Sequence, residues 1–340
     1  MAPPNEGYIF HTYGADCYLK HAIASVHTLR RYDQTRPVAL FCTPRHHERL
    51  REWKLTGQFQ VVEVLPAEHR SIVGFKHALH RFKAFGRSLF VDADMIWCRN
   101  PDPLWRQLSA FPFTATGLQC ADHFFGGPKG IGVVADIVLQ RRARTLRRFG
   151  LTHLPRVQAG MIYAQDRALT EAVSERATYY LTQVDRTHFR SRLEEGRTEE
   201  SCEWSLAMAM SERDLAVFPW LQGQNSPQLD YIDSLTAHDA DFIDVRCRYY
   251  TVPFVYNFRG LPVRWIRDTV LRIADGLPRL GDSMDVTPYA LHFGWLHQKQ
   301  TFYDFAERIW TDLLSDAVAP VSESSTVPPY SSSAETVGGD

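Results

Sequence analysis

The stretch SLFVDADMIW, residues 88–97, places two carboxylates at the end of an apolar run. The apolar residues before Asp92 favour a buried strand. Side chains two positions apart on an extended chain point to the same side, so we expect Asp92 and Asp94 to share one side while Ala93 faces the other. Two like charges held close together repel unless a cation lies between them. The stretch therefore indicates a site for a divalent ion such as Mn²⁺ or Mg²⁺, which prefer oxygen ligands.

The segments before this stretch alternate between strand and helix patterns. Apolar runs predict strands at 8–12, 37–42, 59–65 and 88–91, and amphipathic patterns predict helices at 18–31, 44–55 and 74–85. Such alternation is typical of an α/β fold with a mostly parallel sheet flanked by helices. Open sheets of this kind bind ligands beyond the carboxyl ends of their strands, which is where Asp92 falls.

The rest of the chain continues the mixed pattern. Helices are expected at 100–108, 133–149, 168–181, 202–210, 263–274 and 302–314, and strands at 113–118, 157–164, 215–218 and 290–293. Residues 222–248 are polar and show no clear period, and the glycine-rich residues 121–132 are expected to form a mobile loop. We predict one domain over residues 1–316, followed by a disordered Ser/Pro/Gly-rich tail at 317–340.

Composition narrows the class of protein. The 340 residues are 44% apolar and 23% charged, which permits a sizeable core. The 38 basic and 39 acidic residues leave no net basic field for nucleic acid. The N-terminus lacks a secretory signal pattern, and no apolar run approaches the roughly 18 residues of a membrane span. Six scattered cysteines without a C-x-x-C pair argue against a zinc ribbon or a disulfide framework, so we expect a cytoplasmic protein.

Arginine pairs at 141–142 and 147–148 lie on the helix expected after the glycine-rich loop. A solvated helix face is the favoured interpretation, and contact with an acidic acceptor or with a membrane surface is the alternative. A location peripheral to the membrane therefore stays open beside the cytoplasmic one.

Several motifs occur in an order that resembles a known family. The pattern Y-x-x-H-x-x-x-S-x-x-x-L-R follows the first strand at residues 18–30, and GFKHAL at 74–79 precedes the Asp-Ala-Asp stretch. This order resembles the GT-A nucleotide-diphospho-sugar glycosyltransferases, in particular their glycogenin/LPS-galactosyltransferase-like branch. The segments QAGM at 158–161 and HFG at 292–294 fit more loosely. Gln158 stands where the branch has Asn, and the Gly and Lys that follow His292 are each shifted by one position.

The resemblance implies a GT-A (Rossmann-like) fold, with a nucleotide-binding half at about 7–110 and an acceptor half at about 111–316. It implies a metal-dependent, hexosyltransferase-like enzyme that moves a sugar from a nucleotide-diphosphate donor to a glycan, lipid-glycan or protein acceptor. The preferred donor is a UDP-sugar, and the preferred stereochemical outcome is retention of anomeric configuration. The metal, Mn²⁺ or Mg²⁺, would be held by Asp92, Asp94 and His292.

Further site residues follow from the same resemblance. Lys76 and Lys299 would contact phosphate, Asp92 and Ala93 the nucleotide, and Gly160 would let the backbone approach the donor sugar. Thr12, Tyr13 and Gly14 end the first strand, where Tyr13 would stack on the base or form a hydrogen bond with it. Glu203 and Gln158 are the catalytic candidates. Each has a plainer interpretation: Glu203 as a helix-surface carboxylate, Lys76 as a solvent-facing lysine, Gly160 as a tight turn and His292 as a packed histidine.

Other functional classes fit less well. Haloacid-dehalogenase-like phosphatases carry Asp-x-Asp on their first strand and continue it differently. Sugar nucleotidyltransferases need a glycine-rich, arginine-bearing N-terminal loop, which residues 13–16 do not supply. The alternative that stays open is a catalytically weak sugar-nucleotide-binding or scaffold protein of the same fold. The sequence leaves the oligomeric state open.

Overall fold

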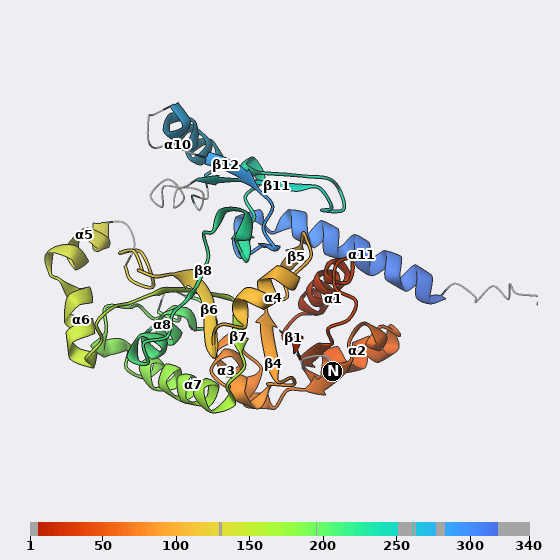
Figure 1. Ribbon diagram of the computed structural model, residues 1–340, viewed down its shortest axis with the longest axis horizontal. Coiled ribbons are helices and arrows are strands. Elements are labelled where there is room, and N and C mark those ends of the chain that lie inside the picture. Colours follow the sequence, from red (N-terminus) through yellow and green to blue (C-terminus); the bar gives the residue numbers. More distant parts are fainter. Residues whose placement is uncertain are drawn as a thin grey trace, which may run out of the picture.

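The computed structural model describes residues 6–128, 131–194, 196–250, 261, 263–276 and 283–318 (Figure 1). Within this part of the chain, seven strands form the main sheet: β1 (Glu6–Thr12), β2 (Val38–Cys42), β3 (Val61–Val64), β4 (Arg87–Val91), β6 (Phe113–Leu118), β7 (Arg156–Ala164) and β8 (Phe218–Pro219). Their order is β3-β2-β1-β4-β7-β6-β8, and only β7 runs antiparallel to its neighbours. The predicted fold class, a mixed and mostly parallel sheet flanked by helices, is confirmed.

Helices cover both faces of this sheet (Figure 1). One face packs against α1 (Asp16–Arg30), α2 (Pro44–Glu52), α4 (Asp102–Leu108) and α11 (Gln300–Val318), and the other against α3 (Ile72–Lys76), α7 (Arg167–Leu181) and α8 (Glu203–Glu212). The alternation of side chains along a strand divides the two cores: on β1, Tyr8 and Phe10 join the first and Ile9 the second.

Two predicted helices are each divided in the structure. The segment expected to be one helix at 74–85 is α3 followed by a 3-10 turn at Leu79–Arg81, because tertiary contacts hold its end: Lys76 reaches Ala159 and His77 reaches Ser205. The segment expected at 133–149 is α5 (Ile131–Val138) and α6 (Arg141–Phe149). Gln140 between them has φ 49°, a left-handed conformation that ends one helix and starts another.

A small sheet lies at the carboxyl edge of the main one, and the sequence predicted one of its three strands, at 290–293. It consists of β5 (Met95–Trp97), β13 (Ala290–His292) and β9 (Gln228–Asp230) in the order β5-β13-β9. Met95 pairs with His292, and His292 pairs with Asp230. Because Asp94 directly precedes Met95, this register carries His292 to the Asp-Ala-Asp stretch.

A third sheet lies beyond the small one, together with α10 (Arg264–Gly276) (Figure 1). Its strands are β10 (Thr236–His238), β11 (Val245–Tyr250) and β12 (Ser283–Val286). No helix among the described residues has the length and apolar character needed to span a membrane. The predicted tail from 317 begins inside α11, which reaches Val318, and its remaining residues lie outside the described part of the chain.

Candidate metal and nucleotide site

The candidate site lies where the order of the main sheet reverses. The chain runs outward from β1 through β2 and β3 and then returns to β4 on the other side of β1. Ligands of open α/β sheets bind at such a switch point, beyond the carboxyl ends of the two central strands. Thr12 ends β1 there, and Asp92 follows the end of β4.

Asp92, Asp94 and His292 converge at this edge. One ligand atom from each side chain lies within 4.8 Å of the others, and this is the one such group found among the described residues. Nε2 of His292 is 3.9 Å from Oδ2 of Asp92 and 3.6 Å from Oδ1 of Asp94. Two carboxylate oxygens and an imidazole nitrogen form a donor set that suits Mn²⁺, so the residues fit the expected ion.

The second carboxylate oxygen of Asp92 and that of Asp94 each form an ion pair with a lysine. Nζ of Lys76 is 2.7 Å from Oδ1 of Asp92, and Nζ of Lys299 is 2.7 Å from Oδ2 of Asp94. Burial raises the pKa of Asp94, but Lys299 and His292 outweigh it and hold that pKa well below its usual range. Burial lowers the pKa of Lys76, but the neighbouring charge of Asp92 outweighs this effect, and Asp94 does the same for Lys299. Both lysines therefore stay cationic. The site thus presents positive charge directly around its carboxylates.

The carboxylate of Asp230, which the sequence did not indicate, contacts the ring nitrogen of His292 that does not face Asp92 and Asp94. Nδ1 of His292 lies 2.9 Å from Oδ1 of Asp230 and 2.7 Å from Nε2 of Gln158. Burial alone lowers the pKa of His292, but the bond to Asp230 and the nearby aspartates raise it to about 9. A carboxylate on one ring nitrogen orients the other nitrogen toward the metal position, a common arrangement behind metal-binding histidines. Asp230 lies in the polar segment 222–248, for which the sequence predicted no helix or strand.

Two glycines permit this close packing. A Cβ atom at Gly294 would lie 2.5 Å from Cε1 of His292, so a side chain there would displace the ring. A Cβ atom at Gly160 would lie 2.7 Å from Cε of Met95 and 2.8 Å from Oε1 of Gln228. The carbonyl of Gly160 also accepts a hydrogen bond from the Asp92 amide at 2.9 Å. Gly160 therefore positions the Asp-Ala-Asp stretch, in addition to the sugar contact that the resemblance implies.

The residues predicted at the end of β1 line the same edge in different ways. Thr12 is buried, and its hydroxyl lies 3.0 Å from Nδ1 of His46 on α2. The hydroxyl of Tyr13 donates to Oε2 of Glu199 at 2.7 Å. Gly14 has φ 76°, a left-handed turn that leads the chain into α1. Ala93 packs against the core on the α1 side of the sheet.

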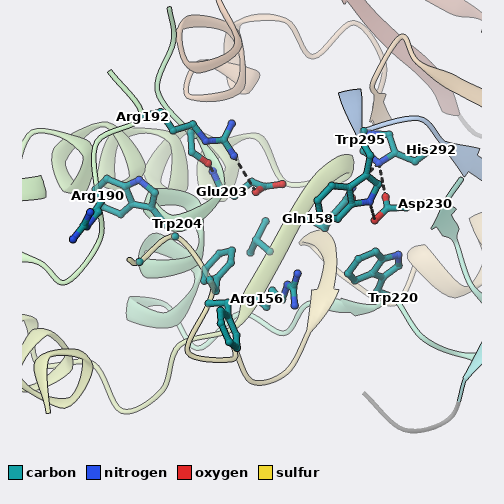
Figure 2. Close-up of a pocket in the computed structure, with 17 residues that line it drawn as sticks. Arg156, Gln158, Arg190, Arg192, Glu203, Trp204, Trp220, Asp230, His292 and Trp295 are labelled. Carbon is teal, nitrogen blue, oxygen red and sulfur yellow. Dashed lines mark hydrogen bonds and ion pairs between the residues drawn. The ribbon is translucent and has the colours of Figure 1, made fainter. Parts of the chain in front are cut away.

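A cavity of about 340 Å³ lies beside His292 (Figure 2). His292, Asp230 and Trp295 lie at one end, and Glu203 and Arg192 lie toward the other. Oε1 of Glu203 accepts from the Ala159 amide at 3.4 Å, and Oε2 is 3.9 Å from Nη2 of Arg192. The structure thus places both catalytic candidates, Glu203 and Gln158, on the cavity wall. No sequence pattern indicated the arginines that line the cavity, which are Arg156, Arg190 and Arg192.

Comparisons with known proteins find similarity in structure alone. No family model and no curated protein sequence matches the chain. The galactosyltransferase LgtC, solved with donor and acceptor sugar analogues, is similar over 93% of this chain and 98% of its own, at 12% identity and TM-score 0.47. Mouse xyloside xylosyltransferase 1 is similar over 66% and 88%, at 12% identity and TM-score 0.43. GlyE of Streptococcus pneumoniae TIGR4 is similar over 92% and 62%, at 11% identity and TM-score 0.46. All three are glycosyltransferases by name.

Proposed function

We propose that the protein is a metal-dependent glycosyltransferase that takes a sugar from a nucleotide-diphosphate donor, with a UDP-sugar preferred. The observation that carries this proposal is the convergence of Asp92, Asp94 and His292 at the sheet's switch point, with a lysine on each aspartate. An oxygen-rich site with adjacent cations suits a Mn²⁺– or Mg²⁺–diphosphate complex, because such ions keep positions that phosphate oxygens fill.

The reaction breaks the bond between the anomeric carbon and the diphosphate, so negative charge grows on the departing oxygen. Asp92, Asp94 and His292 would hold a divalent cation, which would neutralise that charge. Lys76 and Lys299 add fixed positive charge at the same place, and stabilisation of developing charge by positioned groups is usually the largest catalytic contribution. Asp230 keeps the His292 ring oriented, which fixes one side of the site before donor binds.

The cavity beside His292 is the proposed site for the transferred sugar and the acceptor. Its volume of about 340 Å³ lies in the range of small-molecule sites. Trp220 and Trp295 offer apolar surfaces, and Glu203 and Gln158 offer polar atoms toward the anomeric carbon. We assign Glu203 and Gln158 to the transfer step, with retention of configuration as the preferred outcome, and a glycan, lipid-glycan or protein as the acceptor. A cytoplasmic setting, expected from the scattered cysteines of the sequence, is part of the proposal.

Thermal stability of the protein tests the donor class. UDP, GDP and ADP are each added with and without Mn²⁺, and we expect the largest rise in melting temperature with UDP and Mn²⁺ together. Intact nucleotide sugars are then supplied, and the anomeric configuration of the product is read by NMR. Nucleotide binding without turnover of any donor would favour the alternative, a sugar-nucleotide-binding or scaffold protein of the same fold. Absence of metal-dependent nucleotide binding would refute the transferase and the nucleotide-binding alternative, and would leave a scaffold role.

A further inference from the structure

Helix α5 presents an apolar face to solvent. The side of α5 that faces the rest of the protein carries Val133 and Asp136, which are 5% and 4% exposed. The outer side chains are far more exposed: Ile131 89%, Val134 58%, Ile137 48%, Val138 73% and, just after the helix, Leu139 43%. Isolated apolar side chains on a surface are ordinary, but a contiguous helical face of them marks an interaction site. The helix stands at one end of the molecule, away from α2 and α11 (Figure 1).

Helix α6 adds positive charge next to this face. It carries five arginines in nine residues and no acidic residue: Arg141, Arg142, Arg144, Arg147 and Arg148. The one acidic residue between 131 and 150 is Asp136, which is buried and lies 3.4 Å from Nη1 of Arg141. Arg144 donates to the carbonyl of Leu139, so the arginines begin where the apolar helix ends. The whole chain, by contrast, is nearly balanced in charge, with a net charge of −1.

The same region adjoins the cavity of the candidate site. Phe124, Gly126 and Gly127 line that cavity, and Phe124 is 60% exposed. Arg142 donates a hydrogen bond to the carbonyl of Ala121, the residue at which this loop begins. A surface docked through α5 and α6 would therefore lie beside the entrance to the cavity.

We propose that the α5–α6 patch, residues 131–149, docks the protein on a bilayer surface that contains anionic phospholipids. An amphipathic element with apolar side chains on one side and arginines around it suits an interface of this kind, which offers an apolar phase beneath a layer of negative charge. A nucleic acid offers the charge without the apolar phase. A second copy of the chain would bring two arginine-rich helices together, and like charges oppose that contact. Docking is independent of the proposed function, because it is measured without donor, metal or acceptor.

Flotation with vesicles tests the proposal on the full chain. Wild-type protein is expected to float with phosphatidylcholine vesicles that contain phosphatidylglycerol, and to float less as the salt concentration rises. Ile131→Asp combined with Val138→Asp is expected to lower the partition coefficient at least about tenfold, because two side chains no longer enter the interface. Arg147→Gln combined with Arg148→Gln is expected to lower it about 25-fold, from about fivefold for each arginine near an anionic surface.

Matched variants control for the added charge and for folding. Ile243→Asp makes the same substitution at an isoleucine that is 59% exposed outside the patch. Arg51→Gln combined with Arg246→Gln removes two exposed arginines from α2 and β11. Both controls are expected to float as wild type does, and circular dichroism checks that each variant is folded. Wild-type protein that stays unbound at low salt would overturn the proposal. So would equal loss in control and patch variants, or a dimer in solution that Ile131→Asp converts to monomer.

Discussion

Replacing Asp94 with alanine separates the metal-binding role of this carboxylate from its structural role. Asp94 pairs with Lys299 at 2.7 Å, and the two side chains are only 16% and 12% exposed. The substitution leaves Lys299 as a nearly buried charge without its carboxylate. We expect a loss of about 3 kcal/mol in the free energy of unfolding, the lower end of the range for breaking a buried pair, since both side chains keep some contact with water.

The same substitution removes one of three metal ligands. Loss of a group behind a ligand typically costs 10–100-fold in metal affinity, so loss of the ligand itself is expected to cost more than about 100-fold. Saturating metal gives a direct readout. At a concentration about 100 times the dissociation constant, Mn²⁺ stabilises the wild-type protein by about 2.7 kcal/mol, and this increment nearly disappears in Asp94→Ala, falling to about 0.4 kcal/mol or less.

A second substitution distinguishes the two effects. Asp94→Ala combined with Lys299→Met removes the stranded charge, so most of the lost stability is expected to return while the response to Mn²⁺ stays nearly absent. Chemical denaturation with and without Mn²⁺ measures both quantities, and Asp241→Ala, at a surface pair with Arg308, is the control. A full Mn²⁺ increment in Asp94→Ala, or its return in the double variant, would refute the metal assignment.

Three further substitutions test the surroundings of the metal position. Asp230→Asn is expected to lower Mn²⁺ affinity about 10–100-fold, because the His292 ring loses its orienting carboxylate, while Asp285→Asn on β12 leaves it unchanged; calorimetric titration shows the difference, and equal affinities would contradict the role. Gly294→Ala is expected to lower Mn²⁺ affinity although no ligand is removed, because its Cβ would lie 2.5 Å from the His292 ring; titration at wild-type affinity would show that the ring need not move. Glu203→Gln is expected to leave metal-dependent nucleotide stabilisation within about twofold of wild type and to lower transfer at least about 100-fold, with Glu52→Gln as the control; undiminished transfer would return Glu203 to a surface role.

The sequence alone determined the framework and one half of the site. Local periods of two and of 3.6 residues predicted the strands up to residue 91 and the helices between them, except that the helix expected at 74–85 is divided. The order of those elements placed Asp92 at the carboxyl edge of a sheet. The same reasoning missed β5, which is three residues long, and joined α5 to α6, because a left-handed residue such as Gln140 leaves no periodic signal.

Only the tertiary structure decided the other half. Lys299 meets Asp94 across 205 positions of chain, and Gln158 meets His292 across 134. Asp230 belongs to the site because β13 lies between β5 and β9, and this pairing places His292 beside Asp230 in register. A short strand of three residues has too little pattern to show its partner, and the pairing that joins such strands depends on the packing of the whole core.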